Sequence, residues 1–199
     1  LVDYAGRLGF GAPIPFDLPT AISQVTNGTG DAPGGFVDDV ELANAAYGQA
    51  ETFVTPLQMA SAYGVFATGG YRVNPYLIAR ITDAKGKLLN EMTPPVLDES
   101  MRVIDARNAF VMTSLLQEVT RSGTAARAQG TLKRPDVYGK TGTTNDSNDA
   151  WFAGYSPRIT AITWVGFDQP HKLGERETGG GLALPIWMAA MPTPPAAPS

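Results

Sequence analysis

The sequence of 199 residues contains no cysteine and only one histidine, His171. The absence of cysteine excludes disulfide bonds and thiolate metal sites, although it does not separate a periplasmic from a cytoplasmic location. A single histidine in a polar segment is typical of a surface residue. No spacing of metal-ligating side chains stands out, so we expect neither a metal nor another cofactor.

Long apolar runs and an excess of positive charge are also missing. No apolar run approaches the roughly 18 residues of a membrane span. The formal net charge of −4, without a basic patch, argues against a nucleic-acid partner. Hydrophobic residues make up 43% of the chain, which predicts a folded domain with a core. Because the sequence starts at Leu1 without a signal peptide, we expect a piece of a longer, processed protein.

The most informative motif is Lys-Thr-Gly-Thr-Thr at residues 140–144, directly after a short stretch suited to a strand. Lys140 supplies a fixed positive charge, and Thr141 and Thr143 supply hydroxyl donors. Gly142 allows a ligand to approach the backbone closely. Such a strand end can hold a carboxylate while neighbouring backbone N–H groups face a developing oxyanion. The motif therefore predicts an anion-binding edge.

Lysine-threonine-glycine is one of three motifs of the penicillin-interacting serine enzymes, whose other two are S-x-x-K and S-D-N or S-x-N. Neither of those motifs is present at any of the eight serines. Asp146-Ser147-Asn148 has similar letters in another order, and these residues predict a turn. The sequence thus contains the expected substrate-holding edge without a nucleophile or its base.

Local signals predict four helices. The clearest begins at Thr55 with a capping box to Gln58 and ends at Gly69-Gly70. A second runs from a cap at Asp105 to Gly123, and shorter helices are expected within residues 1–11 and 182–191. The helical spacing predicts two sets of core residues: Leu57, Ala60, Tyr63, Gly64 and Ala67 in the first helix, and Phe110, Met112, Leu115, Leu116 and Val119 in the second.

Strand signals predict an extended segment from Tyr71 to Ile81 that leads into a hairpin turn at residues 83–87. A second pair of strands is expected at residues 150–155 and 159–167, turned at residues 156–158. The last strand is apolar on both faces, which indicates a sheet covered by helices on both sides. We expect its aromatic residues to lie mainly in the core: Trp151, Phe152, Tyr155 and Trp164.

With these segments in place, the sequence resembles the transpeptidase domain of class A penicillin-binding proteins, the bifunctional peptidoglycan synthases. The resemblance covers most of residues 47–191. It rests on residues 54–60 (Val-Thr-Pro-Leu-Gln-Met-Ala), 66–71 (Phe-Ala-Thr-Gly-Gly-Tyr), 121–125 (Arg-Ser-Gly-Thr-Ala), 140–146 (Lys-Thr-Gly-Thr-Thr-Asn-Asp), 149–157 (Asp-Ala-Trp-Phe-Ala-Gly-Tyr-Ser-Pro) and 164–168 (Trp-Val-Gly-Phe-Asp).

The resemblance implies an α/β fold of the α+β type, with a five-stranded antiparallel sheet sandwiched between helices, like that of serine β-lactamases. Residues 1–191 would be the C-terminal portion of this domain, beginning just after the S-x-N motif. Residues 192–199 are expected to be a disordered Pro/Ala-rich tail. If the chain supplies only three of the five strands, an unpaired sheet edge and much apolar surface should make it aggregate alone or dock with the missing half.

The implied activity is D,D-transpeptidation through a serine acyl-enzyme, with peptidoglycan stem peptides ending in D-Ala-D-Ala as substrates and β-lactams as inhibitors. Lys140, Thr141, Gly142 and Thr143 would bind the substrate or drug carboxylate. Lys140 and the backbone N–H of Thr143 would be catalytic, the latter as an oxyanion donor. The missing N-terminal half is a further implied partner. The parent protein would lie in a bacterial inner membrane facing the periplasm and would also be a glycosyltransferase, and this chain alone would be inactive.

Other interpretations remain open at this point. The chain could be a non-catalytic module that binds stem peptides or β-lactams, or a fragment of a serine β-lactamase. A lactamase needs a deacylating base, and Glu41, Glu51 and Glu118 have no matching context. A phosphate-binding loop is excluded because Arg134 stands where that motif requires glycine. Arg121, Arg127 and Arg134 could attract an anionic polymer, but scattered surface charge is the expectation.

Overall fold

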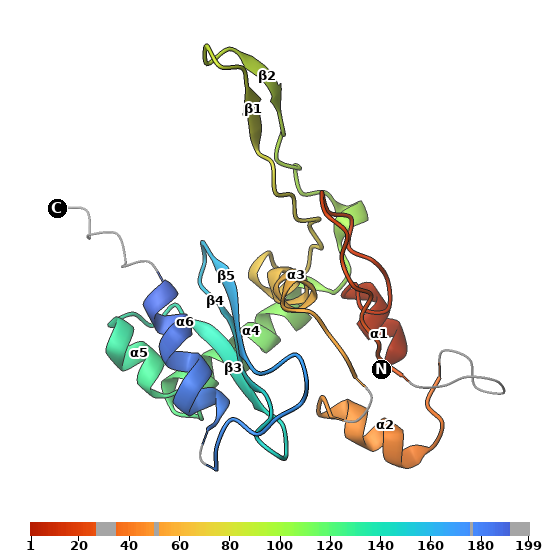
Figure 1. Ribbon diagram of the computed structural model, residues 1–199, viewed down its shortest axis with the longest axis vertical. Helices are drawn as coiled ribbons and strands as arrows, with labels where there is room; N and C mark the ends of the chain where they lie inside the picture. Colours follow the sequence, from red (N-terminus) through yellow and green to blue (C-terminus); the bar gives the residue numbers. More distant parts are fainter. Residues whose placement is uncertain (27–34, 50–51, 176, 192–199) are drawn as a thin grey trace. The chain divides into compact units, whose positions relative to one another are not determined.

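The computed structural model describes four segments of the chain, which form two compact units (Figure 1). The described segments are residues 1–26, 35–49, 52–175 and 177–191. The first unit contains residues 1–65 and 71–104, and the second contains residues 66–70 and those from 105 onward. The predicted tail at 192–199 and Glu51 lie outside the described residues.

The first unit contains short helices and one two-stranded hairpin. Its elements are α1 (Val2–Arg7), α2 (Asp39–Ala46), most of α3 (Pro56–Ala67), β1 (Arg80–Thr82), β2 (Leu88–Glu91) and the 3-10 turn η1 (Glu99–Met101). The strands β1 and β2 pair antiparallel around the turn predicted at residues 83–87. The helix expected within residues 1–11 is also confirmed, whereas α2 was not predicted.

Helix α3 begins as its capping box predicts. The N–H of Gln58 donates to Thr55 Oγ1 at 3.1 Å, and the N–H of Thr55 donates to Gln58 Oε1 at 3.0 Å. The predicted core stripe is wrong, however, because the fully buried residues are Gln58, Ala62 and Val65. The helix is apolar around nearly its whole circumference, so hydrophobic spacing does not determine which face is buried.

The strand predicted from Tyr71 to Ile81 is mostly wrong, because regular pairing begins only at Arg80. Tyr71 makes one isolated bridge, to Arg102. The N–H groups of Leu77 and Ile78 instead donate to Asp17 Oδ2, at 2.6 and 3.3 Å. A side-chain carboxylate thus takes the donors that a strand partner would need.

The second unit contains a three-stranded antiparallel sheet with helices on both faces. Its elements are α4 (Ala106–Arg121), α5 (Arg127–Leu132), β3 (Tyr138–Thr143), β4 (Ala150–Tyr155), β5 (Thr160–Val165), the π-helical segment η2 (Gly179–Ala183) and α6 (Leu184–Ala190). The strand order is β3-β4-β5, with Gly142 opposite Trp151 and Trp151 opposite Trp164. The predicted strand pair and final helix are confirmed, whereas α5 was not predicted.

The main core lies on one face of this sheet. Phe152 is fully buried there, and its ring meets the ring of Trp187 edge-on with centroids 4.8 Å apart. The segments α5, η2 and α6 supply the rest of this core, including Ala128, Ala183 and Leu184. On the opposite face, Thr113 of α4 hydrogen-bonds the hydroxyl of Tyr155 at 2.7 Å. The antiparallel sheet between helices is therefore confirmed.

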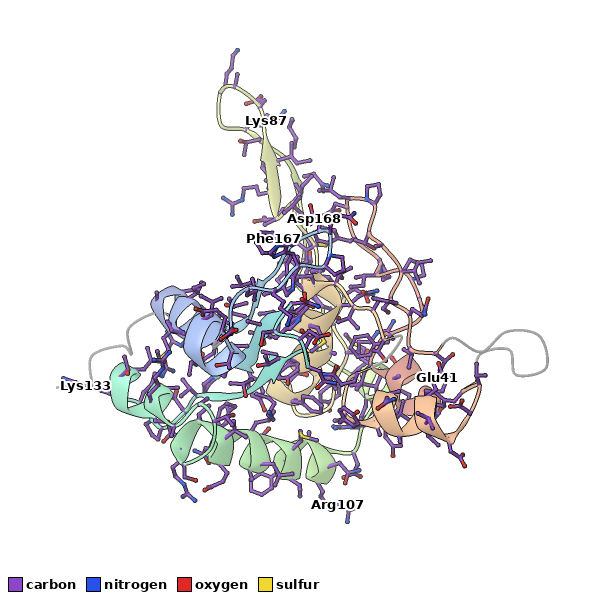
Figure 2. The ribbon with its side chains drawn as sticks, turned by 60° about the horizontal axis from the view of Figure 1, so that its bottom comes forward. Glu41, Lys87, Arg107, Lys133, Phe167 and Asp168 are labelled. Atoms are coloured by element: carbon purple, nitrogen blue, oxygen red, sulfur yellow. The ribbon has the colours of Figure 1, made fainter. Side chains whose placement is uncertain are left out.

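Helix α4 begins at its predicted cap, because Asp105 accepts the N–H of Arg107. Its expected core set is partly wrong, since Leu116 is buried but Phe110 and Leu115 are 72% and 58% exposed. Figure 2 shows Arg107 at the outer surface of α4. The predictions for the aromatic residues hold for Phe152 and Tyr155, which are buried, while Trp151 and Trp164 are half-buried. His171 is exposed, as expected.

A candidate carboxylate-binding edge

The Lys-Thr-Gly-Thr motif forms the last four residues of β3, which is an edge strand of the described sheet. Its register against β4 places Lys140 opposite Ala153 and Thr143 opposite Ala150. The four predicted site residues therefore lie on one continuous, regular stretch of backbone. A strand held by its neighbour over its whole length fixes the positions of these residues more firmly than a loop would.

Side chains alternate along a strand, so Lys140 projects from the sheet face opposite to that of Thr141 and Thr143. The lysine is exposed, and its amine bends back to the backbone of β3. Lys140 Nζ donates to the carbonyl oxygen of Thr141 at 2.9 Å and lies 3.5 Å from Thr141 Oγ1. The positive charge of Lys140 thus lies close to the Thr141 hydroxyl, although the two side chains start from opposite faces of the sheet.

The Thr141 hydroxyl is paired with a second threonine. Thr141 Oγ1 and Thr124 Oγ1 lie 2.7 Å apart, which makes one of them the donor to the other. Thr124 follows the end of α4 and is exposed. Thr124 lies in one of the segments that carry the family resemblance, but the sequence alone does not indicate a role for it, because its contact with Thr141 forms only in the folded chain.

The Thr143 hydroxyl accepts a backbone hydrogen bond from the start of η2. The N–H of Gly179 donates to Thr143 Oγ1 at 3.0 Å. A Cβ atom on Gly179 would lie 2.3 Å from the carbonyl oxygen of Trp151 and 2.5 Å from that of Gly142. Only glycine fits so close to the β3–β4 backbone.

Arg127 holds the next residue of the same segment. Its guanidinium donates to the carbonyl oxygen of Gly180 at 2.7 Å. A Cβ atom on Gly180 would lie 3.1 Å from the carbonyl oxygen of Thr124, so this glycine also packs closely against the site. Arg127 was expected to be scattered surface charge; the structure instead places this exposed residue against the glycine segment that contacts Thr143.

The strand rests on a firm support behind the motif. A Cβ atom on Gly139 would lie 2.6 Å from Phe152 Cζ, which shows how tightly this ring packs beneath β3. Burial raises the pKa values of Tyr138 and Tyr155 above the usual 10.0, so both phenols stay neutral at physiological pH.

Among the residues that the structure describes, no group of three or more His, Asp or Glu side chains could hold a metal ion.

Comparison with known proteins gives one consistent family. The family described as "Penicillin binding protein transpeptidase domain" matches residues 1–191. Penicillin-binding protein 1A of Pseudomonas aeruginosa is 39% identical over 87% of this chain and 26% of its own length. Penicillin-binding protein 1A of Neisseria cinerea is 45% identical over 95% of this chain and 20% of its own length. This chain therefore spans about a fifth to a quarter of these relatives.

Solved structures give the same result. Penicillin-binding protein 1A from Haemophilus influenzae matches 73% of this chain and 27% of its own with a TM-score of 0.67 and 33% identity. Penicillin-binding protein A from Mycobacterium tuberculosis, solved as an imipenem acyl-enzyme complex, matches 94% of this chain and 40% of its own with a TM-score of 0.66 and 26% identity. In the described part of the chain, no helix has the length and apolar character needed to cross a membrane.

Proposed function

Because the chain belongs to the penicillin-binding-protein transpeptidase family, we propose that it supplies the carboxylate-holding edge of a peptidoglycan D,D-transpeptidase. In this reaction a serine outside the present sequence attacks the carbonyl carbon between the two terminal D-Ala residues of a stem peptide. The peptide bond breaks, D-Ala leaves, and an ester to the serine remains. The amine of a second stem peptide then attacks the ester, forms the cross-link and releases the serine.

The observation that carries the proposal is the concentration of donors along β3. Lys140 supplies the charge, and the hydroxyls of Thr141 and Thr143 have defined partners that orient them. A carboxylate accepts several hydrogen bonds at once and gains most from donors that are already positioned. The terminal carboxylate of a stem peptide, or the carboxylate of a β-lactam, fits this arrangement.

The ladder pattern supports a role for the Thr143 N–H as an oxyanion donor. The N–H of Thr144 donates to the carbonyl oxygen of Asp149 across the sheet. Hydrogen bonds alternate along an antiparallel pair, so the N–H of Gly142 also faces β4, while those of Thr141 and Thr143 are directed towards the open edge. A substrate carbonyl held along this edge would therefore meet the Thr143 N–H.

The proposal extends to the parent protein. β-Lactams would acylate the same serine, and the parent protein would be anchored in the inner membrane with this domain facing the periplasm. It would also have a glycosyltransferase domain, in keeping with the short span of this chain on its relatives.

The test is acylation of the longest natural polypeptide that contains this sequence by a labelled penicillin, followed by denaturation and intact-mass and peptide mapping. We expect one adduct, on a serine outside residues 1–199. Lys140→Gln should slow acylation by about 100-fold, because it removes a preorganised charge, while the matched control Lys172→Gln, also exposed, should not. An adduct on a serine of the present sequence would contradict the proposal. Reversible binding without any adduct would indicate a binding module instead.

A further inference from the structure

The segment from Thr178 to Gly181 connects the separate parts of the candidate site, although it lies far from the motif in the sequence. Thr178 caps this segment, because its hydroxyl accepts the N–H of Gly181 at 3.0 Å. Gly179 bonds Thr143, and Gly180 lies against Thr124, the partner of Thr141. One backbone segment thus touches the surroundings of both hydroxyls that the proposed function assigns to carboxylate binding.

The hydrogen bond from Gly179 determines where the Thr143 hydroxyl can donate. A threonine hydroxyl has one proton and two acceptor lone pairs. One lone pair takes the N–H of Gly179, so the O–H bond is directed away from that amide. Accepting a hydrogen bond also polarises the hydroxyl and strengthens its own donation. The proton is therefore not directed at the glycine segment and can be donated to a carboxylate oxygen.

Arg127 holds this amide in place. Its hydrogen bond to the Gly180 carbonyl is charge-assisted, and such bonds are roughly twice as strong as neutral ones. The carbonyl belongs to the residue directly after Gly179, so this hydrogen bond restrains the backbone next to the Gly179 amide. Arg127 itself starts α5, whose Ala128 is part of the buried core. The arginine thus connects a fixed helix to the hydroxyl donor.

We propose that Arg127 and Gly179 are positioning residues for carboxylate recognition, acting through the Thr143 hydroxyl. Arg127 fixes the glycine segment through Gly180, and the Gly179 amide orients the hydroxyl so that it donates to the carboxylate of a stem peptide or β-lactam. Neither residue contacts the reacting atoms in this role. The inference rests on the proposed function, because it assumes that Thr143 binds a carboxylate there.

The experiment compares acylation of the full parent polypeptide by a β-lactam carrying a free carboxylate and by its methyl ester. Arg127→Met should slow acylation by the free acid by about 10-fold, the size of effect expected for a hydrogen bond to a charged group. The ester should lose less than about two-fold, because a neutral ester gains little from this donor. The exposed Arg158 provides a matched control, and Arg158→Met should change neither rate.

A second pair of variants tests the amide itself. Gly179→Ala introduces the Cβ collision with the strand backbone and should reduce the preference for the free acid in the same direction. Gly130→Ala is its control, because a Cβ atom there meets nothing within 4 Å. Thermal unfolding followed by circular dichroism reports whether each variant remains folded. If Gly179→Ala does not fold, Arg127→Met still decides the question.

Combining Arg127→Met with Thr143→Val separates the positioning role of Arg127 from the carboxylate-binding role of Thr143. If Arg127 acts through the hydroxyl, Arg127→Met should have no further effect once Thr143 is valine. Equal loss for the acid and the ester, or a full effect in the valine background, would overturn the positioning role alone. If Thr143→Val by itself leaves acylation by the free acid unchanged, the carboxylate role in the proposed function falls, and the positioning role falls with it.

Discussion

Replacing Phe152 with alanine should be among the most destabilising single changes in the second unit. Phe152 is fully buried between the sheet and Trp187, and its ring lies against two glycines of the strands. A Cβ atom on Gly139 would be 2.6 Å from the ring, and one on Gly154 would be 2.8 Å away. The ring therefore packs directly against the strand backbone at Gly139 and Gly154.

The expected size follows from how little this space can collapse. Replacement of a buried phenylalanine by alanine costs about 3–5 kcal/mol, and the value depends on how well the surroundings relax into the cavity. Neither Gly139 nor Gly154 has a side chain that could move in, and the edge-on contact with Trp187 is lost as well. We therefore expect a loss of about 4 kcal/mol, whereas Phe152→Leu should cost about 1 kcal/mol.

The assay is equilibrium unfolding in urea followed by tryptophan fluorescence. All three tryptophans, Trp151, Trp164 and Trp187, lie in the second unit, so their signal reports its unfolding. The matched control is Phe110→Ala, because that side chain is 72% exposed on α4 and should change stability by less than about 0.5 kcal/mol. A loss below about 1.5 kcal/mol for Phe152→Ala, or equal losses for both variants, would refute the packing argument.

Three further variants probe other contacts. Thr120→Val should cost about 1–3 kcal/mol in urea unfolding, because the fully buried Thr120 Oγ1 donates to the Val137 carbonyl at 2.7 Å and valine leaves that oxygen unpaired. Thr55→Ala removes the cap of α3 and should cost about 1 kcal/mol, seen as a loss of helical circular dichroism at a lower urea concentration. Arg134 lowers the pKa of Asp136 below its usual 3.8, so their pairing stabilises the fold above that pH and is lost as the pH falls through the folded-state pKa. Between about pH 5 and pH 2 the wild type should therefore lose more stability than Asp136→Asn, and parallel urea midpoints would contradict this.

The parts of the fold that the sequence predicts correctly are those set by neighbouring residues. The starts of α3 and α4 follow from Thr55 and Asp105, whose side chains cap amides two or three positions away. The strands β4 and β5 follow from dense aromatic and β-branched residues on either side of a proline turn. In each case the decisive contact lies within a few residues, so a local pattern contains all the necessary information.

The errors arise where distant residues decide the outcome. Asp17 takes the amides that would have extended β1, and it lies 60 residues before Leu77 in the chain. The short α5 has neither a side-chain cap nor an apolar stripe long enough to detect, and it is held by core packing of Ala128. For α3, the apolar residues surround the helix, so only the tertiary structure selects Val65 and its neighbours for burial.

The residues of the candidate site also fall into two groups, those that a local motif identifies and those that only the folded chain identifies. Lys140 and Thr143 are recognisable from their motif, but Arg127 is not, because its hydrogen-bond acceptor is 53 residues away. A signal for Gly179 was present in the sequence, since three consecutive glycines stand directly before an expected helix. Such a run indicates a close approach of backbone to backbone, although it does not say which strand is approached.

The Lys-Thr-Gly-Thr motif has two proposed tasks, binding the oxyanion and binding the carboxylate, and the geometry of β3 assigns them to different groups. The amides of Thr141 and Thr143 are directed towards the open edge, where a substrate carbonyl would lie, whereas the Thr143 hydroxyl is bonded to the glycine segment on one face of the sheet. The ladder to β4 determines the first arrangement and Gly179 determines the second. Loss of the Arg127 side chain, which hydrogen-bonds the glycine segment rather than β3, should therefore alter recognition of a carboxylate without moving the amide that would face the oxyanion. This separation is the physical reason why the free acid and its ester should respond differently to Arg127→Met.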